Sequence, residues 1–314
     1  MSQLRYFCIS LLLLFGASQA FAQPITLVTL GDSLTKGDGD AEGGGGYPAR
    51  LQKKLEAAYP STRLMNLAQS GMTTDDLIDA QLEPALEQLG KAPPGNAKVA
   101  LVWIGSNDLF GLYNFVCDEQ YPNDYESCER ESSAIFSDNI NTILASLQSG
   151  GASVYIALLD DQSKRPVMTD QLLRQSSFDR FTAEEVPRMA AQIAKYNDII
   201  RKTAARLGVT LVDFSTTTLL QNRATLDRDG NHPNGAGYDQ IADIWHQAVA
   251  SATPNTPAPT TPPAIRDPVP DADVDPEDAP GKANDAATDI TPEPSLEPVP
   301  PEGAKGPASH PPAQ

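Results

Sequence analysis

A serine, a histidine and an aspartate form the first candidate set for chemistry in this chain. Ser33 lies in Gly31-Asp32-Ser33-Leu34, directly after an apolar run, and His232 follows Asp229 by three residues. A neutral imidazole can take a hydroxyl proton and return it to a leaving group, while a carboxylate on the other ring nitrogen fixes the tautomer. These residue types suit acyl transfer with Ser33 as the nucleophile. The tetrapeptide also fits an ordinary turn, because glycine, aspartate and serine all favour turns.

His232 is the best-placed base among the three histidines of the sequence. His310 lies in a proline-rich tail, and His246 lies within the predicted last helix, away from any strand end. His232 instead lies in the loop Asp229-Gly230-Asn231-His232-Pro233, directly before that helix. The alternative is that this loop is only a turn leading into the helix and carries a solvated histidine.

Two further loops carry hydrogen-bond donors of the kind that acyl transfer needs for the oxyanion of its tetrahedral intermediate. Gly71 ends Gln69-Ser70-Gly71 after the predicted second strand, and Asn107 lies in Gly105-Ser106-Asn107-Asp108 after the predicted central strand. Glycine lets a backbone N–H approach a substrate closely, and an asparagine amide is a neutral donor. Each loop alone is also compatible with an ordinary turn, but four such loops at one sheet edge are harder to explain in that way.

Strand and helix patterns alternate over residues 23–250, which predicts one α/β domain with a parallel sheet. Because parallel strands end at one edge of the sheet, we expect the four loops to meet there. Residues 160–179 have no clean period and are a candidate binding loop or lid. The predicted strands are residues 25–30, 63–67, 99–104, 154–159 and 209–214. The predicted helices are 47–59, a segment at 75–89 broken near Pro84, one ending at Gly150, one from a capping box at Thr182 and Glu185 to Leu207, and a last one through Trp245.

The sequence resembles the GDSL/SGNH hydrolases, a family of secreted or periplasmic lipases, esterases and thioesterases. Four motifs carry the resemblance in the family's order: Gly-Asp-Ser-Leu-Thr at 31–35, the glycine at 71, Gly-x-Asn-Asp at 105–108 and Asp-x-x-His-Pro at 229–233. The resemblance implies that residues 23–250 form an SGNH hydrolase domain. Its fold would be a three-layer α/β/α flavodoxin-like sandwich, here with a five-stranded parallel sheet.

The resemblance also implies roles for five residues. Ser33 is the expected nucleophile, Asp229 and His232 complete the triad, and Gly71 and Asn107 join the Ser33 backbone N–H in the oxyanion hole. The expected activity is hydrolysis of small-molecule or lipid acyl esters through an acyl-enzyme on Ser33, with no cofactor and no metal. A carbohydrate O-acetylesterase is the alternative among enzymes, and a catalytically silent secreted binding module is the alternative outside them.

Two segments near the expected site depart from the family pattern. Residues 36–46 form an acidic, glycine-rich insert beside Ser33, and the segment from Cys117 to Cys128 is an insert after Asn107. The glycine run lacks the Gly-Lys-Ser/Thr and Gly-x-Gly-x-x-Gly patterns of phosphate cradles. Its acids at 38, 40 and 42 resemble the start of a calcium loop, but an alanine at 49 occupies the last ligand position, where a bidentate glutamate belongs. We expect a flexible acidic flap rather than a cation site.

Residues 1–22 have the pattern of a cleavable signal peptide, with one charge at Arg5, an apolar stretch and small residues up to Ala22. The apolar part is too short to span a bilayer, so we expect no transmembrane anchor and a secreted or periplasmic protein. Cys8 leaves with this segment. Cys117 and Cys128 then remain in an oxidising compartment, where we expect them to form a disulfide, and they supply too few ligands for zinc.

The formal net charge of −18 argues against nucleic acid and anionic membranes as partners. Residues 251–314 hold 17 of the 27 prolines, no aromatic residue, and a charge of −8 from eleven acidic and three basic residues. Such a composition cannot bury enough apolar surface to offset its ordering entropy, so we expect a disordered, acidic, Pro/Ala-rich tail. It serves either as a spacer that tethers the enzyme at a surface or as a solvated extension without a specific partner.

Overall fold

The computed structural model describes residues 23–41 and 43–251 of the chain. The predicted signal peptide lies outside the described residues, and so does the predicted tail apart from Ser251, which ends the last helix. Within the described ranges, no helix combines the length and the apolar character needed to cross a membrane.

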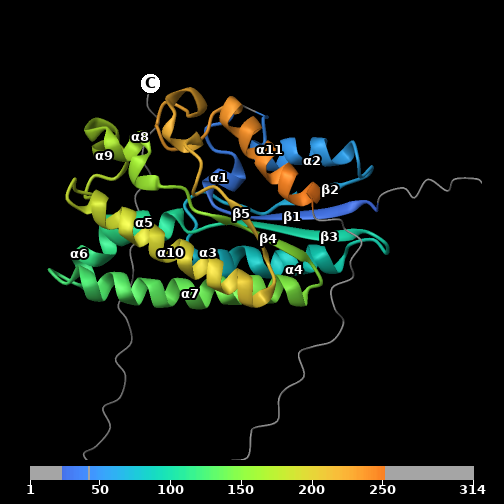
Figure 1. Cartoon of the computed structure of the whole chain (residues 1–314), viewed down its shortest axis with the longest axis horizontal. Helices are drawn as coiled ribbons and strands as arrows, with labels where there is room; N and C mark the ends of the chain where they lie inside the picture. The colour runs from blue at the N-terminus through green and yellow to red at the C-terminus, as the bar shows by residue number, and fades with distance from the viewer. Residues whose placement is uncertain (1–22, 42, 252–314) are drawn as a thin grey trace, which may run out of the picture. The chain divides into compact units, whose positions relative to one another are not determined.

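Five parallel strands form one sheet in the order β2-β1-β3-β4-β5, shown edge-on in Figure 1. This order is that of flavodoxin-like folds, in which the chain reverses its direction of growth between β1 and β3. The predicted five-stranded parallel sheet is confirmed, although β3 begins two residues before the predicted start. The strands are β1 Ile25–Gly31, β2 Arg63–Asn66, β3 Ala97–Trp103, β4 Ser153–Leu158 and β5 Thr210–Asp213.

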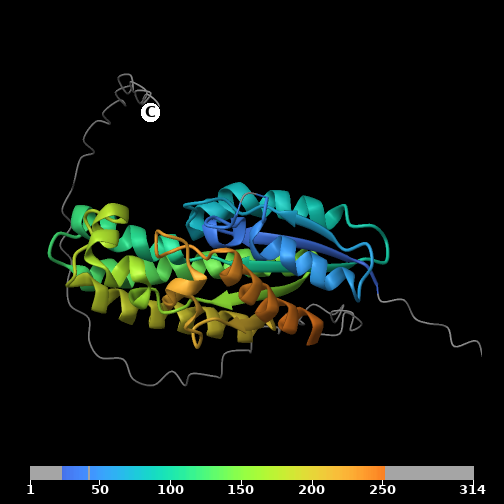
Figure 2. The same ribbon diagram turned by 90° about the horizontal axis from the view of Figure 1, so that it is seen from above.

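Helices cover both faces of the sheet and complete the three layers (Figures 1 and 2). On one face α2, Gly46–Glu56, packs against α11, Gly235–Ser251. On the other face α7, Tyr125–Ser149, packs against α10, Glu185–Leu207, and α4, Glu83–Gly90, lies under β1. Because both faces are covered, the strands β1, β3 and β4 are almost continuous apolar runs.

Two helical segments differ from the sequence prediction. The predicted break near Pro84 takes the form of a π-helical segment, Ile78–Leu82, between α3, Thr74–Leu77, and α4. Helix α10 begins at Glu185 and not at Thr182, because a turn separates the two residues. The Thr182 N–H and hydroxyl still donate to the Glu185 carboxylate, at 2.7 and 2.9 Å.

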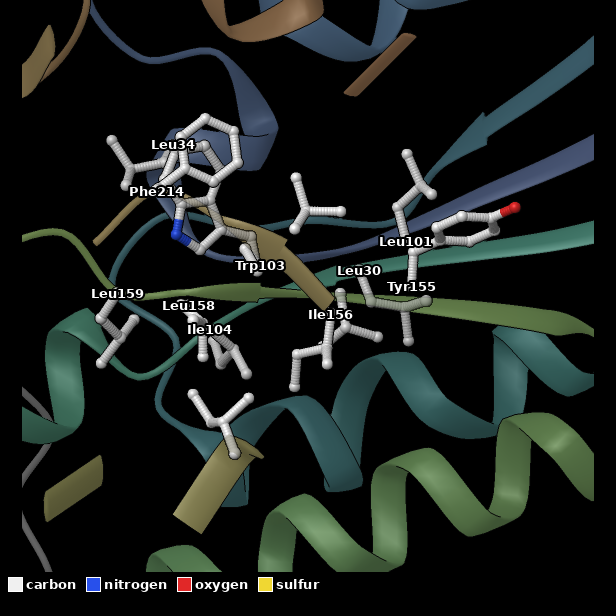
Figure 3. Packing of buried hydrophobic residues seen from close by; sticks show 14 of the residues in the cluster. Leu30, Leu34, Leu101, Trp103, Ile104, Tyr155, Ile156, Leu158, Leu159 and Phe214 are labelled. Carbon is white, nitrogen blue, oxygen red and sulfur yellow. The ribbon is translucent and has the colours of Figure 1, made fainter. Parts of the chain in front are cut away.

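Aromatic side chains support the carboxyl end of the sheet on the face covered by α2 and α11. Trp103, the last residue of β3, stacks on Phe214 with ring centroids 4.2 Å apart, and Figure 3 shows this pair beside Leu34. Tyr47 of α2 stacks on Trp245 of α11 at 5.6 Å. This packing fixes the edge at which the candidate loops emerge.

Residues 160–179, predicted as a binding loop or lid, contain three short helices. They are the 3₁₀ turn Gln162–Lys164, α8 Pro166–Thr169 and α9 Gln171–Ser177. Between β3 and α7 lie α5 Ser106–Gly111, the π-helical segment Leu112–Val116 and α6 Cys117–Gln120. Two further 3₁₀ turns, Leu219–Gln221 and Arg223–Thr225, precede the loop that carries His232.

Candidate active site

Ser33 is the first residue of the short helix α1, Ser33–Lys36, which starts directly after β1. Asp32 caps this helix, since its Oδ1 accepts the Leu34 N–H at 3.0 Å. Gln81 holds the end of β1 by accepting the Gly31 N–H at 2.9 Å and donating to the Gly31 carbonyl at 2.8 Å. A side chain at position 31 would lie 2.2 Å from the Trp103 carbonyl, so only glycine fits there. The backbone therefore fixes where Ser33 points.

The three predicted residues of the triad lie in hydrogen-bond contact in this structure. His232 Nε2 is 2.8 Å from Ser33 Oγ, and His232 Nδ1 is 2.5 Å from Asp229 Oδ2. An ionised carboxylate only accepts hydrogen bonds, so Nδ1 carries the proton and Nε2 is left to accept from the serine hydroxyl. The arrangement can move a proton from Ser33 Oγ to the imidazole.

The charge of Asp229 is held in place by donors from its own loop. Its Oδ1 accepts the backbone N–H groups of Asn231 and His232, at 2.9 and 3.0 Å. Partial burial works to raise the pKa of Asp229, but the hydrogen bonds from the His232 ring and from these two N–H groups outweigh it and lower that pKa to about 2. Asp229 is therefore ionised at neutral pH.

A buried ion pair from the β4–α8 connection anchors the loop of residues 227–233. Arg165 donates to both carboxylate oxygens of Asp160 at 2.9 and 2.6 Å, and both side chains are 1% exposed. The same guanidinium donates to Asn231 Oδ1 at 2.8 Å. The Val167 N–H adds a bond to the Gly230 carbonyl at 3.0 Å. The residues between Asp229 and His232 are thus tied to the end of β4.

The two candidate oxyanion donors occupy neighbouring loops. Asn107, in the first turn of α5, donates through Nδ2 to the Met72 carbonyl at 2.9 Å, which leaves the second amide hydrogen for another acceptor. Gly71, directly before Met72, has a φ of 81°, a conformation that favours glycine. The loop of Gly71 also contacts α1, because Lys36 Nζ donates to Ser70 Oγ at 2.9 Å. The loops after β1, β2 and β3 are therefore linked to one another.

Two further carboxyl groups lie beside these motifs, of which Asp32 is buried and Asp108 is partly buried. Burial raises the pKa of Asp32 to about 6, and one of its oxygens has no hydrogen-bond partner among the described residues. Burial likewise raises the pKa of Asp108 to about 6, although this carboxyl accepts from the Thr74 N–H and hydroxyl. Asp108 joins α5 to the start of α3, and Asp32 caps α1. Both carboxyl groups therefore hold the helices that follow β1 and β3 in place.

The described part of the acidic glycine-rich segment, residues 36–41 and 43–46, is bound to the domain through Asp40, and the prediction of a flexible flap is corrected at this residue. The Asp40 carboxylate is bound by Arg50 Nη1 and Nη2 at 2.5 and 3.0 Å, and it accepts the Gly46 N–H at 3.0 Å. Arg50 continues to Asp239 of α11 at 2.7 Å. The cation that Asp40 binds is therefore a guanidinium. A Cβ on Gly39 would lie 2.8 Å from the His232 Cβ, so this segment packs directly on the histidine.

The family model of the GDSL-like lipase/acylhydrolase family matches residues 29–240 of this chain. The chain belongs to that family. A lipase from a goat rumen metagenome, Lip_vut3, is 21% identical, with a TM-score of 0.53 over 71% of this chain and 97% of its own. An extracellular lipase from Streptomyces rimosus is 19% identical, with a TM-score of 0.50 over 71% of this chain and 99% of its own. At these identities the two structures support the fold. Comparison with curated protein sequences returned no significant match.

Two sets of supporting residues in this GDSL hydrolase were not identified from the sequence. Arg165, Asp160 and Asn231 gave no periodic or motif signal, although Asp160 directly follows a predicted strand. The pairing of Asp40 with Arg50 was hidden by the glycines around Asp40. The signals that the sequence offered were Asp160, which directly follows a predicted strand, and Arg50, which lies in the predicted helix after Asp40. The structure also pairs Cys117 with Cys128 in a disulfide, with Cα atoms 5.5 Å apart, as the cysteine count predicts.

Proposed function

We propose that this GDSL hydrolase is a serine ester hydrolase of the carboxylesterase or lipase type. The observation that carries the proposal is the continuous contact from Ser33 Oγ through the His232 ring to the Asp229 carboxylate. The ionised Asp229 favours the tautomer in which His232 accepts the serine proton. The hydrogen bonds from Arg165 to Asn231 and from Arg50 to Asp40 hold the neighbouring loops in place without substrate.

The proposed reaction has two halves. Ser33 Oγ attacks the ester carbonyl carbon while His232 Nε2 takes its proton, and the resulting oxyanion receives hydrogen bonds from the Ser33 N–H, the Gly71 N–H and the Asn107 amide. Collapse of this intermediate breaks the bond to the alcohol, which leaves with the proton from His232 and yields an acyl-enzyme on Ser33. Water then attacks the acyl carbonyl carbon while His232 takes one of its protons. Collapse of the second intermediate breaks the bond to Ser33 Oγ, which takes the proton from His232, and the free acid is released.

Hydrolysis of p-nitrophenyl acetate and butyrate tests the proposal directly. Ser33→Ala is expected to lower kcat by roughly 10⁶-fold, and Asp229→Asn by roughly 10² to 10⁴-fold. Ser153→Ala, an exposed serine at the amino end of β4, is the matched control and is expected to behave as wild type. A kcat of Ser33→Ala within about tenfold of wild type would refute the mechanism. A wild type without activity would favour the silent binding module.

Acetyl-xylan extends the same assay to the carbohydrate alternative. A carboxylesterase is expected to prefer p-nitrophenyl esters over acetyl-xylan at equal acetyl concentration. The reverse preference would favour a carbohydrate O-acetylesterase that uses the same residues.

We further propose that the enzyme acts outside the cytoplasm. The pattern of residues 1–22 and the disulfide between Cys117 and Cys128 support this. Amino-terminal sequencing of the exported protein is expected to begin at Gln23, and a start at Met1 would contradict cleavage.

A further inference from the structure

Strand β1 extends past the end of its neighbour β2. The last register pair between them joins Thr29 to Asn66, whereas β1 continues to Gly31. Alternate residues of a strand in a parallel sheet direct their N–H and carbonyl groups to the same side, so Gly31 faces the side on which β2 has ended. The chain after β2 reaches Gly31 through the Gln69 N–H, which donates to the Gly31 carbonyl at 3.2 Å. The end of β1 therefore depends on bonds from outside the sheet.

The side-chain amide of Gln81 supplies these bonds. Its Oε1 accepts the Gly31 N–H at 2.9 Å, and its Nε2 donates to the Gly31 carbonyl at 2.8 Å. An amide side chain carries the same kinds of donor and acceptor as a peptide unit, so one glutamine can bond both backbone groups. Gln81 is buried, so the loss of its amide would leave polar backbone groups without a partner away from water.

The π-helical segment Ile78–Leu82 brings Gln81 to this position. Successive residues of an α-helix point about 100° apart, so two neighbours do not both face the same sheet. Here Gln81 and Leu82 are both buried, as are Leu77 and Ala85 in the turns before and after them. The extra residue of the π-helical turn thus directs Gln81 to β1 while Leu82 keeps its place in the core. Such segments are rare and are frequent at functional sites.

Two parts of the proposed catalytic site depend on the position of Gly31. Ser33 follows Gly31 by two residues, and Gly71 follows Gln69 by two residues. The Gly31 carbonyl accepts both the Gln69 N–H and the Gln81 amide. A displacement of Gly31 would therefore move the Ser33 hydroxyl and the Gly71 N–H relative to the ester carbonyl.

We propose that Gln81 is a positioning residue, which acts through the Gly31 backbone to align Ser33 Oγ and the Gly71 N–H for attack on the ester. The inference rests on the proposed ester hydrolase and adds a residue that touches neither substrate nor the reacting atoms. The oxyanion forms only after Oγ attacks, so a misaligned donor weakens the transition state more than the bound substrate. Loss of Gln81 is therefore expected to lower kcat and to leave KM nearly unchanged.

Gln81→Met tests the proposal, because methionine keeps the length of the side chain but cannot donate a hydrogen bond and accepts only weakly. Loss of the two bonds to Gly31 is expected to lower kcat on p-nitrophenyl acetate by about 5- to 150-fold, with KM within about threefold of wild type. Gln192→Met is the matched control. Gln192 is also buried, and its Nε2 donates to the Glu129 carbonyl and to Ser133 Oγ at 3.0 and 2.8 Å, between α10 and α7. We expect it to lower the urea midpoint about as much, with kcat within about threefold of wild type.

Gln81→Glu separates positioning from folding through pH. A neutral carboxyl group can accept the Gly31 N–H and donate to the Gly31 carbonyl as the amide does, whereas a carboxylate only accepts and is repelled by the carbonyl oxygen. Burial favours the neutral form. We therefore expect kcat of Gln81→Glu to lie within about threefold of wild type at about pH 5.5, and the ratio of the two kcat values to fall at least about fivefold by about pH 8.5. Taking the ratio at each pH removes any pH dependence that both proteins share.

The results distinguish a failure of this inference from a failure of the proposed function. If the urea midpoint of Gln81→Met falls as far as that of Gln192→Met while kcat stays within about threefold of wild type, Gln81 supports folding alone and the inference is refuted. Equal losses of kcat in the two methionine variants would refute it as well. If Gln81→Met does not fold, Gln81→Glu decides: a kcat more than about tenfold below wild type at about pH 5.5 refutes the inference. In each of these cases Ser33-dependent hydrolysis by wild type remains. If wild type shows no such hydrolysis, the proposed function fails, and the inference fails with it.

Discussion

Asn231 offers a direct test of how the proposed catalytic loop is held. The Asn231→Ala variant removes the acceptor of the 2.8 Å hydrogen bond from the Arg165 guanidinium. It leaves the buried pair of Arg165 with Asp160 intact, so the change avoids an unpaired buried charge. The backbone N–H of position 231 still donates to Asp229. The substitution therefore loosens the loop without removing any group that touches the reacting atoms.

The magnitude follows from the charge on the donor. A hydrogen bond to a charged group contributes about 1.5–3 kcal/mol, and this range corresponds to about 10- to 150-fold in a rate. If the bond serves to place His232 against Ser33, most of this free energy is lost from the transition state, because a displacement of about 1 Å can cost about 100-fold. We expect kcat on p-nitrophenyl acetate to fall 10- to 150-fold while KM changes by less than threefold.

The assay is steady-state hydrolysis at pH 7.5, accompanied by urea unfolding of the same samples. Asn231→Asp keeps an acceptor for Arg165. Its decrease in log kcat is therefore expected to be at most half of the decrease in Asn231→Ala. The reasoning is refuted if Asn231→Ala loses about 1.5 kcal/mol or more of unfolding free energy while kcat stays within twofold of wild type. The anchor would then stabilise the domain without positioning the histidine.

Further predictions concern pH, the disulfide and the supporting carboxyl groups. Because the pKa values of Asp32 and Asp108 are raised to about 6 in the folded protein, their contribution to stability is complete below about pH 4 and is lost as pH rises through about 6. Urea unfolding at pH 4.5 and 7.5 is expected to show this loss, smaller by up to about 2 kcal/mol in Asp32→Asn, and an identical loss in the variant would contradict it. Asp229, with its pKa lowered to about 2, contributes stability that is present above about pH 4 and disappears only as pH falls toward 2, which acid unfolding of Asp229→Asn tests. Replacing Cys117 and Cys128 by serine opens a loop of sequence separation 11 and is expected to lower the unfolding free energy by about 3 kcal/mol, with no further effect of reductant on the variant.

The fold and the residues of the candidate triad could be predicted because each depends on short stretches of sequence. β1 is a buried apolar run that ends at Gly31, and the residues after it must leave the sheet at its carboxyl edge. His232 could be chosen because few histidines compete with it. Such inferences need only the local pattern and the rule that parallel strands end together.

The supporting contacts could not be predicted because they join residues that are far apart in the sequence. Arg165 and Asn231 are separated by 66 positions, and nothing local shows that the arginine is buried. The flexibility predicted for residues 36–46 was wrong at Asp40 for a different reason. Its glycines suggested freedom, whereas positive φ values at Gly37, Gly39, Gly45 and Gly46 allow one tight path that Asp40 then fixes through Arg50.

The fastening of residues 36–46 also decides when the conformational entropy of the site is lost. When a loop becomes ordered only on substrate binding, the lost conformational entropy weakens binding by about 1–2 kcal/mol per residue. Here the bonds between Asp40 and Arg50 form as the domain folds, so the cost of ordering Asp40 counts against the free energy of folding and not against substrate affinity. If substrate orders Asp40, a change that breaks its bonds to Arg50 would therefore move this cost from folding to binding.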